Sequence, residues 1–167
     1  AYRVAGAGLG DPTAAAVGSL AVAEAGPPGA GPSRAGPGDA RWLPAWQGRP
    51  MTELSVAEAD FSGNPVIGPF ARDGLTRADY RWMVQAWEEV VRPGLRRGLT
   101  RDDFAARDAE RGVPVTRSIA NVHDIFLCDP VQVERRPDGK LGVLNGRHRI
   151  EIARELGIST LPGVVIE

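Results

Sequence analysis

Apolar residues in the middle of the chain recur at the three- and four-residue spacing of a helix. The stripe consists of Tyr80, Met83, Val84, Trp87, Val90 and Val91. Thr76 precedes it, and Asp79 stands three residues later, which is the arrangement of a capping box. Pro93-Gly94 follows the stripe and is typical of a helix end. The pattern therefore predicts an amphipathic helix that begins after Thr76 and ends at Pro93.

Two further helices are predicted between this one and residue 128. Thr100, with Asp103 three positions on, begins a short helix that reaches Glu110 and stops before Gly112 and Pro114. The next segment, 116–127, again carries apolar residues at helical spacing. They are Ile119, Val122, Ile125 and Phe126.

The period of the pattern changes to two after Asp129-Pro130, and the change indicates strands. Val131 and Val133 alternate with polar residues, the turn 136–139 follows, and Leu141 and Val143 alternate again. This arrangement predicts a β-hairpin. A helix over 147–156 and a closing strand over 163–166 come next, while 53–61 is expected to add a short strand. We therefore predict an α+β domain whose N-terminal half is helical and whose C-terminal part forms a small mixed sheet.

The first fifty residues differ in composition from the rest. The run from Gly26 to Pro32 consists of Gly and Pro except for Ala30, and it is not expected to form regular structure. We interpret 1–50 as a Gly/Pro/Ala-rich flexible segment or linker and 51–167 as the folded domain. Two interpretations remain open: a linker to an upstream part of a larger protein, or an extended reading of a gene whose start is Met51.

Charge and cysteine content narrow the classes of partner. The net charge is −1, with an isoelectric point near 6.2, so nucleic acid could be bound only through a local basic cluster. The single cysteine, Cys128, excludes an internal disulfide, and two histidines make a zinc site unexpected, so we predict no protein-bound metal cluster. We find neither a run of about 18 apolar residues nor a signal peptide, and we predict no membrane partner.

The segment Asn145-Gly146-Arg147-His148-Arg149 carries the strongest chemical signal. Gly146 allows a strand to turn tightly into a helix, whose first N–H groups point outward and favour an anion. The two arginines match phosphate oxygens, and His148 can donate a hydrogen bond or move a proton near neutral pH. Cations oppose the dipole at a helix N-terminus, and a bound anion would relieve that cost. The competing interpretation is a solvated basic surface.

This segment also resembles a known family. Gly146 to Ala153 reads GRHRIEIA, and it is followed by Glu155-Leu156-Gly157 and by Leu161-Pro162 before a strand. The pattern resembles the ParB/sulfiredoxin superfamily, specifically over 131–167, with Asn64-Pro65 as a distant match to its first motif. The resemblance implies a strand–turn–helix element that binds the phosphates of a nucleotide or nucleic acid. By position, that role falls on Gly146, His148 and Arg149, with Asn145 and Arg147 beside them.

Departures from the family limit the activities that can be expected. Arg147 stands where sulfiredoxins carry their catalytic cysteine, which excludes that reaction, and the helix-turn-helix DNA reader of partition proteins is not found after the motif. The activities that remain are those of a ParB-like nuclease and of an ATP-dependent phosphotransferase. The nuclease could be the toxin domain of a bacterial effector. The alternative is a non-catalytic nucleotide-binding switch.

Mg²⁺ with a nucleotide is the expected cofactor, and the partners could include an upstream delivery domain or an immunity protein. The location is cytoplasmic, or extracellular for a secreted effector.

Phosphate chemistry also requires an acid, a base or a carboxylate near the ligand. We predict His148, Asp124 and Glu151 as the catalytic candidates, with Asp108 and Asp60 as further carboxylates to examine. For Asp124 the competing interpretation is a solvated helix residue. A carboxylate close to the helix start would favour catalysis, whereas apolar surroundings would favour binding alone.

Overall fold

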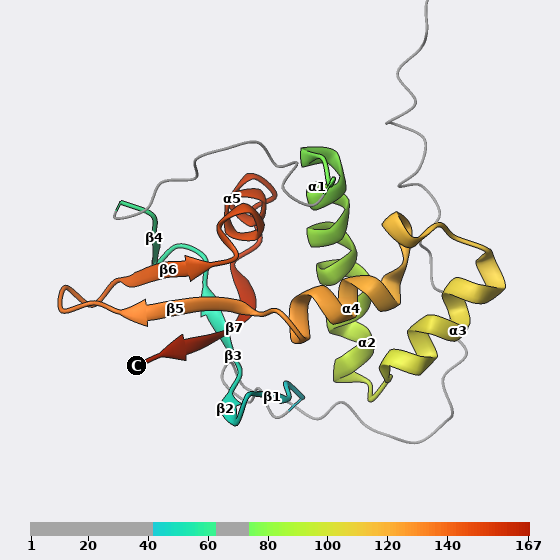
Figure 1. The fold of residues 1–167 in the computed structure, drawn as a ribbon, viewed down its shortest axis with the longest axis horizontal. Helices are drawn as coiled ribbons and strands as arrows, with labels where there is room; N and C mark the ends of the chain where they lie inside the picture. Colours follow the sequence, from blue (N-terminus) through green and yellow to red (C-terminus); the bar gives the residue numbers. More distant parts are fainter. Residues whose placement is uncertain (1–41, 63–73) are drawn as a thin grey trace, which may run out of the picture. The chain divides into compact units, whose positions relative to one another are not determined.

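The computed structural model describes residues 42–62 and 74–167. These residues form an α+β arrangement with a mixed sheet, as the alternation of periods predicts (Figure 1). Most of the helical residues precede the β-hairpin, and the last helix lies between the hairpin and the final strand. Asn64-Pro65 and residues 1–41 lie outside the described residues.

Five strands form the sheet in the order β3-β7-β5-β6-β4. They are β3 (Thr52–Ser55), β4 (Ala59–Asp60), β5 (Val131–Arg135), β6 (Leu141–Asn145) and β7 (Thr160–Ile166). The predicted hairpin is confirmed, since β5 and β6 pair antiparallel with Val133 opposite Val143. The closing strand β7 lies between β3 and β5, antiparallel to the first and parallel to the second.

The prediction of one strand over 53–61 is wrong. A turn at 56–58 divides this segment into β3 and β4, which lie at opposite edges of the sheet. The guanidinium of Arg154 donates to the carbonyl oxygen of Val56, the first residue of the turn, and to that of Ala59, directly after the turn. This long-range contact stabilises the turn. The pattern of apolar and polar residues in this segment does not predict the contact.

The first helical rod continues beyond its predicted end. α1 (Arg77–Ala86) passes into a π-helical turn, η3 (Trp87–Val91), and then into α2 (Arg92–Arg96). Pro93 is the second residue of α2 and has no N–H for a carbonyl of the preceding turn, and the π-helical turn directly before it is where the regular hydrogen-bond ladder is interrupted. Gly94 serves packing, because a Cβ there would lie 2.7 Å from Cζ of Phe104. The prediction that the helix ends at Pro93-Gly94 is therefore wrong.

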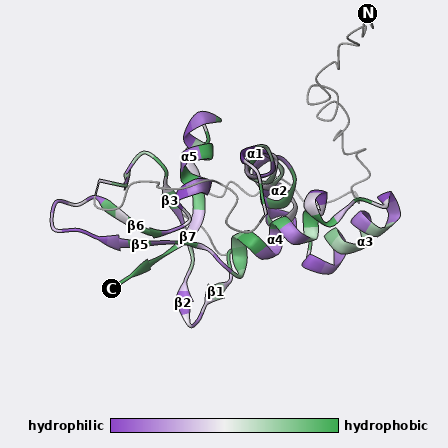
Figure 2. Ribbon diagram, turned by 45° about the horizontal axis from the view of Figure 1, so that its top comes forward, coloured by the Kyte–Doolittle hydropathy of each residue, from purple (hydrophilic) through white to green (hydrophobic). Residues whose placement is uncertain are grey.

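The remaining helices follow the sequence pattern closely. α3 (Arg101–Arg111) begins with the predicted capping box of Thr100 and Asp103 and ends at Gly112, which has φ +60°. A 3₁₀ turn, η4 (Val115–Arg117), precedes α4 (Ile119–Leu127), and α5 (Arg147–Glu155) follows β6. Hydrophobic colour concentrates along α4 and hydrophilic colour along α3 in Figure 2.

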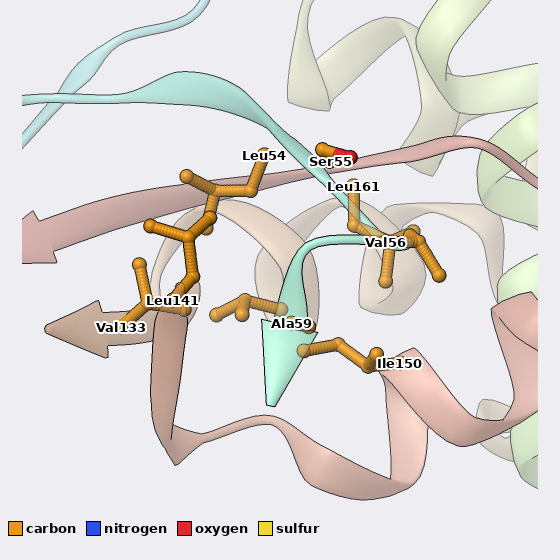
Figure 3. Close-up of a pocket in the computed structure, with 9 residues that line it drawn as sticks. Leu54, Ser55, Val56, Ala59, Val133, Leu141, Ile150 and Leu161 are labelled. Carbon is orange, nitrogen blue, oxygen red and sulfur yellow. The ribbon is translucent and has the colours of Figure 1, made fainter. Parts of the chain in front are cut away.

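The core lies between the helices and one face of the sheet. Trp87 of η3 stacks on Phe126 of α4 with ring centroids 4.7 Å apart, and both side chains are fully buried. Ile150 of α5 closes an apolar crevice against the sheet (Figure 3). The crevice is too narrow for a water molecule, so it belongs to the core and is not a ligand cavity.

Residues 42–50, which the sequence interpretation assigned to the flexible segment, have defined structure. β1 (Ala45–Trp46) pairs with β2 (Arg49–Pro50), and Leu43 is buried in the core. Trp46 donates its indole N–H to the carbonyl oxygen of Cys128 at 2.9 Å. The folded part of the chain therefore includes residues upstream of Met51.

Replacing Gly163 tests how tightly β7 packs between β3 and β5. A Cβ at this position would meet the side chain of Leu54 and would lie 2.5 Å from the carbonyl oxygen of Val131. We expect Gly163→Ala to lower the free energy of unfolding by about 3 kcal/mol, because backbone on a central strand cannot move away. The control Gly98→Ala meets no atom but has φ +86°, and should cost only about 1 kcal/mol. Urea denaturation of both variants checks this, and equal losses would contradict it.

The capping box at the start of α1 can be tested through the pH dependence of the stability that Asp79 contributes. Hydrogen bonds from Thr76, and then from Arg117, lower the pKa of Asp79 from 3.8 to about 2. Its contribution to stability is therefore complete above pH 4 and is lost as the pH falls through 2. We expect Asp79→Asn to be less stable than the parent by about 2 kcal/mol at pH 5. The difference should shrink towards zero near pH 2 in denaturation series, and a constant difference would contradict the assignment.

Candidate functional site

The turn between β6 and α5 has the tight geometry that the sequence predicts. β6 ends at Asn145, Gly146 has φ +87°, and α5 begins at Arg147. A Cβ on Gly146 would lie 2.9 Å from Cγ2 and 3.2 Å from Cα of Val131. Glycine is thus required here both for its left-handed conformation and for the close approach of β5.

The start of α5 differs from the other capped helix starts. Thr76, Thr100 and Ser118 each accept a backbone N–H in the first turn of α1, α3 and α4. No side chain of the N-cap residue does so at α5, and its first turn contains no acidic residue. The first N–H groups of α5 therefore receive no side-chain acceptor from the cap, which leaves the positive end of the helix dipole uncompensated there.

Asn145 holds the turn through both ends of its amide. Its Oδ1 accepts the N–H of Gly146 at 2.8 Å, and its Nδ2 donates to Oδ1 of Asp129 at 2.8 Å. Both polar groups of the Asn145 amide thus help to shape the turn, and its contact with a phosphate stays a prediction.

Arg149 has partners other than a phosphate. Its side chain is 5% exposed, and its Nη1 donates to the carbonyl oxygens of Ile125 and Asp129 at 2.9 and 2.5 Å. The guanidinium also lies 5.6 Å from the ring centre of Phe126. Burial lowers the pKa of Arg149, and the charge of Asp129 opposes that effect. The structure therefore places the Arg149 side chain inward, where it donates to carbonyl groups at the end of α4, and its contact with a phosphate stays a prediction.

Arg147 and His148 are the half-buried side chains of the first turn. The ring of His148 lies 5.4 Å from the ring of Tyr80 on α1, tilted by 57°. Arg147 forms no ion pair within the described part of the chain, and its Nε has no hydrogen-bond partner there. The structure therefore brings together Gly146, Arg147 and His148 at the open helix start, with Tyr80 beside them.

The predicted carboxylates lie in ion pairs of their own. Both carboxylate oxygens of Asp124 lie 2.9 Å from Nε of Arg101 and share its single N–H, and Nδ1 of His123 lies 3.0 Å from Oδ1 of Asp124. Glu151 pairs with Arg77 of α1 at 3.2 Å. Asp124 thus joins α4 to α3, and Glu151 joins α5 to α1.

The two further carboxylates are also occupied elsewhere. Asp108 accepts from the backbone N–H groups of Ile119 and Ala120 and so caps α4. Asp60 accepts from Ser62, which lowers its pKa, and from Arg136 at 2.6 Å. Neither residue contacts the start of α5 among the described residues.

Asp129 is the carboxylate that the sequence interpretation missed. Its Oδ1 accepts from Asn145, its Oδ2 lies 3.5 Å from Nη2 of Arg149, and its side chain is 64% exposed. The signal was present in the hairpin, because pairing β5 with β6 places the residues before Val131 beside the residues after Asn145.

No group of three or more metal-ligating side chains occurs in residues 42–62 and 74–167. Comparisons of the chain with protein-family models, with curated proteins and with solved structures found no match. Over the same described ranges, no helix is both long and apolar enough to cross a membrane.

Replacing Arg149 tests its internal role. Arg149→Met leaves the carbonyl groups of Ile125 and Asp129 without their donor, and we expect a loss of about 2–4 kcal/mol in the free energy of unfolding. Arg147→Ala removes a positive charge two residues away and should change stability by about 0.5 kcal/mol or less. Chemical denaturation of both variants provides the measurement. Similar small losses would contradict the inward placement of Arg149.

Proposed function

We propose that the start of α5 binds a phosphate group of a nucleotide or nucleic acid, and that the domain carries out phosphate chemistry as a nuclease or phosphotransferase. The proposal rests on the open helix start at Gly146, which has no side-chain cap and carries Arg147 in its first turn. A helix N-terminus attracts anions through its outward N–H groups and its dipole.

Electrostatics supports an anionic ligand at this position. Arg147 places a cation at the end of the helix where positive charge is unfavourable, and no ion pair with described residues compensates it. A phosphate would accept hydrogen bonds from the backbone and match the guanidinium at the same time. A bound anion would thus supply the negative charge that compensates Arg147 and the helix dipole.

The resemblance to the ParB/sulfiredoxin superfamily supports the same ligand class, with the residue roles adjusted. Gly146, Arg147 and His148 are the proposed phosphate-binding residues. Asn145 and Arg149 hold the turn and the end of α4 in place. His148 remains the proposed proton donor or acceptor, because it lies in the first turn of α5 and an imidazole nitrogen can give or take a proton.

The position of Asp129 favours an enzyme over a binding module. A carboxylate near the phosphate can hold a divalent cation or activate a nucleophile. Mg²⁺ typically binds through one or two carboxylates together with phosphate oxygens, so it fits a site with a single exposed carboxylate. The second candidate is a non-catalytic nucleotide-binding switch, and the engagement of Asp124 and Glu151 in ion pairs favours it.

A ligand screen on the full chain tests the phosphate site. We expect at least one of ATP, CTP, GTP, short DNA or short RNA to raise the unfolding temperature. A ligand at 100 times its Kd stabilises by about 2.7 kcal/mol. Arg147→Ala should weaken this ligand about tenfold or more because it removes a charge-assisted contact. The matched control Arg111→Ala removes an exposed charge on α3 and should bind as the parent does.

Two results would contradict the proposal. One is a screen in which no phosphate-bearing ligand changes the unfolding temperature. The other is equal binding by the Arg147→Ala variant and the parent. Turnover of the bound ligand, followed by phosphate release or strand cleavage, separates the enzyme from the switch.

A further inference from the structure

Residues 42–50 form a small hairpin that is separate from the five-stranded sheet. β1 and β2 pair at two positions only, around a turn in which Gln47 has φ +48° and Gly48 has φ +76°. Residues 47–50 are exposed. A two-stranded hairpin of this size is not stable by itself in water, so its structure depends on contacts with the helices.

Two tryptophans provide these contacts. Trp42 packs against Trp87 of η3 with ring centroids 6.3 Å apart, and the guanidinium of Arg96 lies 5.3 Å from the ring centre of Trp42. Trp46 is half-buried and donates its indole N–H to the carbonyl oxygen of Cys128 at 2.9 Å. The hairpin is thus attached at one point to η3 and α2 and at another to the end of α4.

The end of α4 is held from α5 as well. Nη1 of Arg149 donates to the carbonyl oxygens of Ile125 and Asp129, and Cys128 lies between these two residues in the chain. The last carbonyl groups of a helix have no partner within the helix, and here two different segments supply the donors. A displacement of this turn would therefore strain the contact with Trp46 and the contacts with Arg149 together.

We propose that residues 42–50 act as a strap, whose docking on the end of α4 holds the start of α5 in place. Release of the strap would free the end of α4 and loosen the first turn of α5 at a lower free energy than global unfolding. Segments with few buried contacts and exposed backbone open in this local manner, and such openings can couple distant sites. Trp46 is then a positioning residue that acts through α4 and Arg149.

Amide hydrogen exchange of the full chain, followed by NMR under native conditions, tests the coupling. The reporting amides are those of Cys128 and Ile150, which donate within the last turn of α4 and the first turn of α5. Gly48→Ala places a Cβ in open space at a positive φ, which favours release of the strap. We expect both amides to exchange about tenfold faster in this variant.

The matched control is Gly98→Ala, between α2 and α3. It makes the same substitution at φ +86°, also in open space, and should leave both exchange rates as in the parent. Equal rises in the two variants would show that the amides respond only to global stability. No rise in Gly48→Ala would show that the start of α5 opens without the strap. Either result overturns the proposal.

A second variant removes the hydrogen bond of the strap and keeps an aromatic ring. Trp46→Phe should raise the exchange rates of the Cys128 and Ile150 amides about fivefold, the typical effect of one lost hydrogen bond. Trp82→Phe makes the same change on α1, away from the strap, and should leave these rates unchanged. A rise at Cys128 without a rise at Ile150 would contradict the link to α5.

The coupling has a consequence for a ligand, and this part rests on the proposed function. Coupling between two sites is reciprocal, so a phosphate ligand bound at the start of α5 should hold the strap closed. ATP, CTP and GTP are tested at 100 times the Kd of the one that binds best. Exchange of the Trp46 indole N–H should slow by up to about a hundredfold. An unchanged rate with bound ligand overturns the link, whereas a chain that binds none of the three contradicts triphosphate binding and leaves the strap to the exchange rates of the variants.

Discussion

The contact between Arg149 and the end of α4 is the interaction on which the site depends. A buried guanidinium is costly unless its donors are satisfied, and here the carbonyl oxygens of Ile125 and Asp129 accept them. The contact joins the last turn of α4 to the first turn of α5. It also sets the place of Asp129, since the same residue provides a carbonyl to Arg149 and a carboxylate to Asn145.

Two elements brace α5 against the rest of the fold and leave its start open. On the sheet side, Ile150 and Ile152 are buried in the core, and Gly146 permits the close approach of Val131. On the helical side, Arg77 of α1 pairs with Glu151 and Glu155. A helix held along its length keeps its N-terminal groups in fixed positions, which lowers the entropy cost of binding an anion there.

Local signals predicted the elements well and their long-range partners poorly. The capping boxes at Thr76 and Thr100, the hairpin and the glycine before α5 all follow from neighbouring residues, and each is present. The division of 53–61 into two edge strands depends on Arg154, about a hundred positions away in the chain. Likewise, Pro93-Gly94 resembles a helix end until Phe104 is seen to pack on Gly94.

The same limit applies to the site. Sequence reasoning located the turn at Asn145–Arg149, because a strand, a glycine and a run of cationic residues are adjacent in the chain. The burial of the Arg149 guanidinium and the ion pair of Asp124 with Arg101 depend on residues distant in the chain, so neither can be predicted from the local sequence. Asp129 became visible only when strand pairing brought it beside Asn145.

The most direct test of the account is a two-dimensional amide NMR titration of the full chain with the phosphate ligand that binds best. We expect the largest shift changes at the amides of Gly146, Arg147 and His148, with smaller changes at Asp129. Changes centred instead on the basic hairpin tip, around Arg135, Arg136 and Lys140, would show that phosphate binds elsewhere and would contradict the claim that the start of α5 is the functional site.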